Sequence, residues 1–297
     1  MDSQFVSIGL PLALALVMFG LGMSLTVDDF VRVTKAPRIA VIALTCQMFL
    51  LPAIAFGLAV AFDLAPLLAV GIMILAASPG GTTANLFSHL FRGDVALNIT
   101  LTAVNSVLAV VTLPLLANLA IEYFEPSTAG DVGLQFGKTV QVFAIVLIPV
   151  GIGMLVRRFA PGFAARTDRA VRILSAVVLA AVVAGAILAE RENIRSYFLD
   201  VGVVMIAFCI ASLAVGYTLP RLLSATEGQA IACCFEIGIH NVTLAIAVAV
   251  TVLDSSEMAI PSAVYGVLML PIAAAFGWLL VSRRRAAQPV AGPRPGN

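Results

Sequence analysis

Nine long apolar segments govern what this chain can fold into. They cover about residues 5–27, 38–61, 66–90, 95–120, 135–156, 170–189, 198–219, 227–253 and 260–281. An α-helix needs about 20 apolar residues to cross the hydrocarbon core of a bilayer. Only 11% of the residues are charged, whereas a soluble domain has about 25%. The sequence therefore predicts an all-α polytopic membrane protein with nine transmembrane helices.

The basic residues predict the orientation of these helices, because cytoplasmic loops are enriched in Lys and Arg. With the N-terminus outside, the outer side carries only Lys138, Arg191 and Arg195. The other fourteen of the 17 basic residues then fall on the inner side: Arg32, Lys35, Arg38, Arg92, Arg157, Arg158, Arg166, Arg169, Arg172, Arg221, Arg283, Arg284, Arg285 and Arg294. We therefore predict an outside N-terminus and a cytoplasmic C-terminus.

The links between the apolar segments are short, which predicts a single transmembrane domain over residues 1–285. A disordered cytoplasmic tail is expected over residues 286–297, which contain Pro and Gly. The sequence has no basic patch on a folded domain, so nucleic-acid binding is not predicted, and no protein partner is inferred. The four cysteines lie in apolar runs without CxxC spacing and are expected to be small buried side chains.

Two of the apolar segments are interrupted by helix-breaking and polar residues. The third contains Pro79-Gly80-Gly81, where proline removes a backbone donor and glycine lets the chain leave helical geometry. The eighth contains Glu236, followed by Gly238 and the pair His240-Asn241. An isolated carboxylate deep in a membrane costs roughly 2.5–3.5 kcal/mol on insertion scales. Glu236 is therefore expected to face a cation, a proton or a polar cavity.

The two interrupted segments are third from the start and second from the end, which are roughly matching places in two halves of opposite topology. Such a pair is typical of an inverted-repeat transporter with its binding site near the middle of the membrane. Asn98, Thr102 and Asn105 lie at i, i+4 and i+7 of the fourth segment and share one helix face. Gln47 is a single amide in the second segment. Carboxylate, hydroxyl and amide oxygens are the ligands that a hard cation such as sodium prefers.

Four stretches of the chain resemble signatures of the bile acid:sodium symporter family. They are Met18-Phe-Gly-Leu-Gly-Met23, Pro79-Gly-Gly-Thr-Thr-Ala-Asn85, Arg92-Gly-Asp-Val-Ala-Leu97 and Glu236-Ile-Gly-Ile-His-Asn241. The resemblance covers nearly the whole chain and implies a bacterial member in the inner membrane. It also implies a panel domain, about residues 5–27 and 135–189, and a core domain, about residues 38–120 and 198–281, which holds two discontinuous helices that cross each other.

The resemblance implies two sodium sites. The first consists of Asn85, Asn98, Thr102 and Glu236, although Ala84 stands where the family often has a serine and Asn98 where it usually has one. The second consists of Gln47, Glu236, the carbonyl groups of Ile237 and Ile239, and His240. The family usually has glutamine at the position of His240. Because a neutral imidazole is a poorer sodium ligand than an amide, a proton is the alternative occupant of this site.

The resemblance further implies an organic anion as substrate, carried by alternating access in symport with sodium. Candidate substrate-binding residues are Thr82, Thr83 and Asn241, next to the helix N-terminus that follows Gly81. Members transport bile acids, steroid sulfates, pantoate and other organic anions. Met269-Leu270 stand where some bacterial relatives have a His-Asn pair, so substrate preference does not carry over. A small carboxylate such as pantoate is favoured over a bile acid.

Two other functions are open at the level of sequence. An efflux carrier of similar fold, such as an arsenite exporter, would use a membrane cysteine, and Cys233 and Cys234 are the candidates. An intramembrane enzyme would use Ser88 and His89 or a Cys–His pair. Adjacent residues on a helix do not face each other, and no acid completes such a set. We therefore predict a transporter that is not an enzyme.

Overall fold

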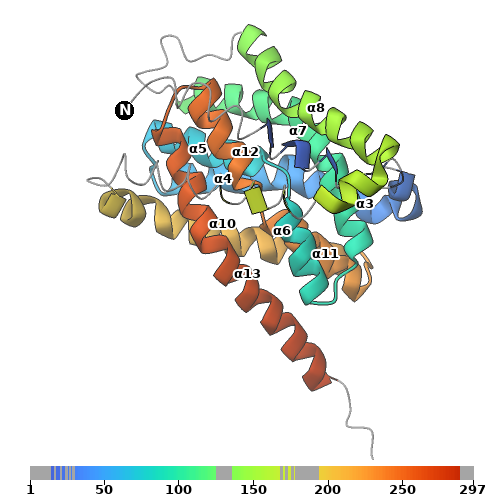
Figure 1. Ribbon diagram of the computed structural model, residues 1–297. Helices are drawn as coiled ribbons and strands as arrows, with labels where there is room; N and C mark the ends of the chain where they lie inside the picture. Colours follow the sequence, from blue (N-terminus) through green and yellow to red (C-terminus); the bar gives the residue numbers. More distant parts are fainter. Residues whose placement is uncertain are drawn as a thin grey trace, which may run out of the picture.

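The computed structural model describes residues 15–16, 18–20, 22–23, 26, 28, 31–124, 136–167, 170, 173–174, 177 and 194–287. Within these ranges the chain is almost entirely helical (Figure 1), and its β-type pairing is an isolated antiparallel bridge between Gly80 and His240. The predicted all-α class therefore holds for the described residues. Most of the predicted spans 5–27 and 170–189 lies outside them.

The first fully described span is a helix with a widened turn in its middle. It consists of α3 (Pro37–Thr45), the π-helical turn η2 (Cys46–Leu50) and α4 (Leu51–Ala61), preceded by the short 3-10 turn η1 (Arg32–Lys35). Pro37 lies in the first turn of α3, where its missing N–H removes no helical hydrogen bond, whereas Pro52 directly follows the π turn inside the continuous span. The π turn carries Gln47, which is buried.

The other described helices follow the predicted segments closely. They are α5 (Pro66–Ala77), α6 (Thr82–Leu90), α7 (Val95–Phe124), α8 (Phe136–Phe159), α10 (Ile194–Leu222), α11 (Glu227–Gly238), α12 (Val242–Ala247) with the π turn η4 (Val248–Val252), the 3-10 turn η5 (Glu257–Ala259) and α13 (Ile260–Ala287). Helix α13 thus includes Ala286 and Ala287 of the predicted tail, and residues 288–297 lie outside the described residues.

Three stretches of the described chain are long and apolar enough to cross a membrane: Pro37–Ala61, Val201–Leu222 and Glu257–Ser282. A fourth is added if the two parts of α7, which meet at a bend of 54°, count as one span. The third and eighth predicted segments are each divided into two shorter helices. A helical membrane protein is supported, and the count of nine spans stays a prediction.

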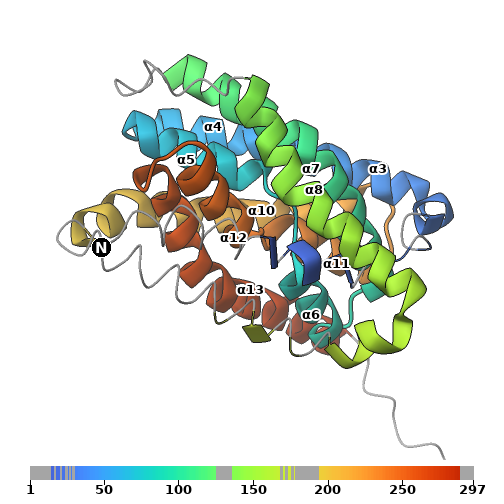
Figure 2. The ribbon, with the colours of Figure 1, turned by 45° about the horizontal axis from the view of Figure 1, so that its top comes forward.

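Glycines allow several helices to approach each other closely. A Cβ atom added at Gly216 of α10 would lie 3.0 Å from backbone atoms of Cys233 and Cys234 in α11. One added at Gly71 of α5 would lie 2.4 Å from the carbonyl oxygen of Met258, in the η5 turn just before α13. Helix α5 also packs against α7 and α4 (Figure 2), so it is enclosed by neighbours and most of its side chains are buried.

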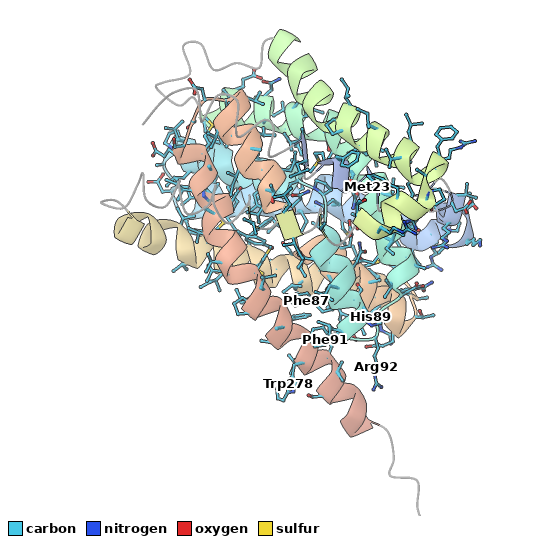
Figure 3. All side chains as sticks on the ribbon, in the orientation of Figure 1. Met23, Phe87, His89, Phe91, Arg92 and Trp278 are labelled. Carbon is cyan, nitrogen blue, oxygen red and sulfur yellow. The ribbon has the colours of Figure 1, made fainter. Side chains whose placement is uncertain are left out.

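Helix α8 packs against the described residues of the first predicted span. A Cβ atom at Gly153 would lie 2.4 Å from the carbonyl oxygen of Phe19, and one at Gly22 would meet the backbone of Val150. Met23 lies at this contact (Figure 3). Both segments belong to the predicted panel. Because most of its third helix lies outside the described residues, the division into panel and core stays a prediction.

An aromatic cluster joins α6, α11 and α13. The Phe235 ring lies 5.5 Å from the ring of Phe87 and 5.4 Å from that of Phe91, between ring centroids. Gly277 of α13 leaves room for the Phe91 ring, which would be 2.6 Å from an added Cβ. Figure 3 shows Trp278 on the other side of α13, pointing away from this cluster. The cluster packs the second half of the first interrupted region, α6, and the first half of the second, α11, against α13.

Candidate functional site

The two interrupted helix pairs cross each other at their breaks. Helix α5 ends at Ala77 and α6 begins at Thr82, while α11 ends at Gly238 and α12 begins at Val242. Gly80 and His240 form the antiparallel bridge, and the N–H of Asn241 donates to the carbonyl of Pro79 at 2.8 Å. We call residues 78–81 and 239–241 together the crossing. It joins two segments about 160 positions apart by backbone contacts.

Glu236 lies at the crossing, on the last turn of α11, and its side chain is 0% exposed. The Thr102 hydroxyl donates to its Oε2 at 2.5 Å, and the Asn105 amide donates to its Oε1 at 3.0 Å. The backbone N–H of Gly80 also hydrogen bonds to the carboxylate. Neutral donors thus surround the group, and no Lys or Arg of the described residues forms an ion pair with it.

Several amide oxygens near this carboxylate have no hydrogen-bond partner within the described residues. The Nδ2 group of Asn98 donates to the carbonyl of Ala232 at 2.7 Å, and its Oδ1 is left buried and unpartnered. The Oδ1 atoms of Asn105 and Asn85 are also buried without a partner. Asn98 and Asn105 lie on α7, and Asn85 lies on α6, which packs against both α7 and α11. A buried acceptor without a donor is costly, and this group of oxygens therefore suits a cation.

Gln47 and His240 meet at a different atom, the carbonyl oxygen of Ser78. The Gln47 amide donates to it at 3.0 Å and to the carbonyl of Ala76 at 3.2 Å. His240 places Nδ1 3.2 Å from the same Ser78 oxygen. Because a carbonyl oxygen only accepts, Nδ1 carries the hydrogen in this contact. Both side chains therefore act as donors to the first break, residues 78–81. Gln47 ties η2 to it, and His240 ties the second break, residues 239–241, to it.

The predicted substrate residues lie beside the crossing with unequal roles. Asn241 accepts a hydrogen bond from the N–H of Leu244 at 3.1 Å and so caps the N-terminus of α12. The N-terminus of α6 has no side-chain cap, and a Cβ atom at Gly81 would have no atom within 4 Å. Thr83 is half-buried in the first turn of α6, and the side chain of Thr82 lies outside the described residues.

The pair at which some bacterial relatives have His-Asn lies on α13. Met269 is buried there, and Leu270 is exposed.

Two residues at the site were not among the predicted ligands. Asn105 shares the predicted polar face of α7, and its hydrogen bond to Glu236 adds it to the site. Tyr265 of α13 donates its hydroxyl to the carbonyl of Gly238 at 2.8 Å and packs edge-on against the His240 ring. The spacing of polar residues on α7 carried a signal for Asn105. Nothing in the sequence around Tyr265 distinguishes it from an ordinary core aromatic residue.

The residues of the alternative functions are not arranged for chemistry. Cys233 and Cys234 are free, buried thiols on α11, and Cys234 Sγ donates to the carbonyl of Leu213 in α10 at 3.3 Å. Ser88 is buried, whereas His89 is exposed near the end of α6 (Figure 3). Within the described residues, no group of three or more His, Cys, Asp or Glu side chains could hold a metal ion.

Comparison with known proteins gives a consistent result. The model of the sodium bile acid symporter family matches residues 11–197. The chain belongs to this family. It is 29% identical over 267 residues to the uncharacterized sodium-dependent transporter YocS of Bacillus subtilis, covering 89% of this chain and 80% of the relative. It is also 29% identical over 244 residues to the human ileal sodium/bile acid cotransporter, covering 82% of this chain and 69% of the relative.

A third relative is a probable chloroplastic sodium/metabolite cotransporter of Oryza sativa, 25% identical over 256 residues, covering 86% of this chain and 60% of the relative. Membership in the family makes the chain a sodium-coupled membrane transporter and not an enzyme. The predicted family is therefore confirmed. The names of the relatives differ in what is carried with sodium, so the substrate does not follow from membership.

Proposed function

We propose that this member of the sodium bile acid symporter family takes up a small organic anion, such as a carboxylate of the size of pantoate, together with sodium. It would work by alternating access in a bacterial inner membrane, with the N-terminus outside. The observation that carries the proposal is the fully buried Glu236, held by neutral donors at the crossing of two interrupted helices.

The sodium ion would lie between Glu236 and the unpartnered amide oxygens of Asn85 and Asn98. Thr102 belongs to the same site, because its hydroxyl can donate to Glu236 and still offer a lone pair to a cation. Asn105 joins this set through its free Oδ1. A sodium ion there would neutralise the carboxylate, which would otherwise be costly to bury.

The anion would bind at the N-terminus of α6, beside Thr82 and Thr83. This helix end has no side-chain cap and has open space next to Gly81. The first N–H groups of a helix have no partner within the helix. The N-terminus of α12 is less available, since Asn241 already caps it. Helix N-termini attract anions through these N–H groups and the helix dipole. Asn241, which lies in the second break, would then contact the anion with its side-chain amide group.

Sodium couples to the anion because both bind at the same crossing. The ion binds to α6, α7 and α11, and so fixes the break from which α6 begins. A ligand shifts a conformational equilibrium only by its different affinity for the two states. We propose that sodium binds more tightly when the crossing is open to the outside, and that panel and core then move to open it to the cytoplasm.

The test is uptake of labelled small carboxylates and a bile acid into proteoliposomes under an inward sodium gradient. Replacing Glu236 by Gln is expected to reduce sodium-driven uptake by at least tenfold, because the amide cannot neutralise the ion. The matched control is Glu227→Gln, an identical change nine residues earlier on α11, where the carboxylate pairs with Arg221 at the edge of the protein. It should leave uptake within about twofold of wild type, since exposed ion pairs contribute little.

Sodium-driven uptake that survives Glu236→Gln would contradict the ion role. The efflux alternative predicts loss of transport when Cys233 and Cys234 are changed to Ser. Symport should survive this change, because the side chains that hydrogen bond to Glu236 are those of Thr102 and Asn105. A proton-coupled variant through His240 predicts that His240→Gln changes the pH dependence of uptake. We expect no such change, since the Nδ1–H donor to Ser78 is present whether or not Nε2 carries a proton.

A further inference from the structure

The unwound backbone at the crossing does not present its carbonyl groups freely. Ala76 and Ser78 accept hydrogen bonds from Gln47, and Ser78 accepts a further one from His240. The carbonyl of Gly238 accepts from the Tyr265 hydroxyl. The carbonyls of Pro79 and His240 accept from the backbone N–H groups of Asn241 and Val242. Five carbonyls that helix interruption would release are therefore already paired with donors.

His240 is fixed in this role by aromatic packing on two sides. Its ring stacks on Phe208 with centroids 5.4 Å apart and planes 16° from parallel, and it meets Tyr265 edge-on at 5.4 Å. The ring is 2% exposed. The imidazole ring carries no oxygen that could bind sodium. Its Nδ1–H donates to Ser78, and its other nitrogen, Nε2, has no partner within the described residues.

The carboxylate of Glu236 is also committed to the other side of the crossing. Its recorded side-chain contacts are with Thr102 and Asn105 of α7, and none is with Gln47 or His240. Besides the main-chain carbonyls of Ile237 and Ile239, the residues implied for a second sodium site thus offer one unpartnered side-chain oxygen, Oε1 of Gln47. The set around α7 offers three such oxygens in addition to the carboxylate.

We infer that this chain binds one sodium ion per transport cycle, and that hydrogen bonds from Gln47, His240 and Tyr265 replace the second ion. This inference rests on the proposed function, since it concerns the number of ions at the proposed site. At the second sodium site, the chain departs from the family pattern at a single side chain, that of His240. An amide at position 240 would carry an oxygen, whereas the imidazole of His240 contributes an N–H donor. In this structure the donors themselves hold the two breaks together, so the second ion is not needed to do so.

The test counts radiolabelled sodium bound at saturation to the purified full-length protein in detergent, without any anion. We expect one ion per chain for wild type and none for Glu236→Gln. His240→Gln should raise the number toward two, because the amide brings an oxygen to Gln47. His89→Gln is the matched control, the same change at the other histidine of the chain, and should leave the number at one.

Each outcome decides one point. Two ions bound to wild type would overturn the inference and leave the proposed symport intact. No sodium binding by wild type would instead refute the proposed function. A folded His240→Gln variant that still binds one ion would contradict the role given to His240. The wild-type count decides the stoichiometry even if that variant does not fold.

Discussion

At the scale of single residues, the site depends on the absence of a side chain at Gly80. A Cβ atom there would lie 2.5 Å from the carboxyl carbon of Glu236, and Gly80 also hydrogen bonds to that carboxylate through its N–H. None of the described glycines has a positive φ, so conformational freedom is not the reason for this residue. Glycine is required at position 80 because the backbone of one break approaches the acid of the other.

The neighbouring glycine provides a matched comparison. Gly80→Ala is expected to displace the Glu236 carboxylate and to abolish the rise in melting temperature that we expect sodium to produce in the wild type. Gly81→Ala should keep it, because its backbone is extended (φ −133°, ψ −179°) and no atom lies within 4 Å of the added carbon. The measurement is thermal unfolding in sodium against potassium, since a ligand stabilises the state it binds. An equal sodium effect in both variants would contradict the close approach.

Tyr265 has a structural role at the same scale. Tyr265→Phe removes the donor to the Gly238 carbonyl and leaves that buried oxygen unpaired. Such a loss costs about 1–3 kcal/mol. We expect a clear fall in melting temperature, with Tyr123→Phe as the control on an exposed ring of α7. Equal melting temperatures for the two variants would show that the hydroxyl does not support the break.

At the scale of helices, the close approach of α5 to α13 is the contact most open to test. A side chain at Gly71 would collide with Met258 and with Pro261, whose ring atoms lie 2.9 Å and 3.0 Å from the added Cβ. Overpacking of this kind costs about 1–3 kcal/mol. Gly71→Val should therefore lower the melting temperature, whereas Gly57→Val on the exposed face of α4 should not, since nothing lies within 4 Å there.

The helices themselves were largely predictable, because length and apolar composition decide them. The predicted segment 38–61 corresponds to Pro37–Ala61, and the breaks at Pro79–Gly81 and after Gly238 lie where proline, glycine and polar residues interrupt the pattern. Proline carries a sequence signal for two irregularities of the helices. Pro52 directly follows the π turn that carries Gln47, and Pro114 lies inside α7 shortly after its 54° bend. The size of the bend was not predictable from this signal.

The ligand sets were less predictable than the helices. Asn98, Thr102 and Asn105 share a face of α7 by simple spacing, and the structure places two of them on Glu236. The meeting of Gln47 and His240 at Ser78 was not foreseen, because family resemblance gives ligand types and not the direction of each hydrogen bond. At position 240, an acceptor oxygen predicts two bound sodium ions, whereas the N–H donor of His240 predicts one.

At the scale of the whole molecule, the crossing is a joint between segments distant in sequence. It connects η2, α5–α6, α7, α11–α12 and α13 through one acid and a few hydrogen bonds. Figures 1 and 2 show these elements converging from several directions on one region. With one sodium and a singly charged anion, the loaded molecule would carry no extra net charge across the membrane, so the sodium gradient alone would supply the driving force.

The most direct test of this account is accumulation of a labelled small carboxylate in proteoliposomes at zero membrane potential. With an inward sodium gradient, internal anion should rise above its external concentration and then fall as the gradient decays. A potassium gradient of the same size should give only equilibration. Equal accumulation in sodium and potassium, by protein that binds sodium, would contradict the coupling of ion and anion at Glu236.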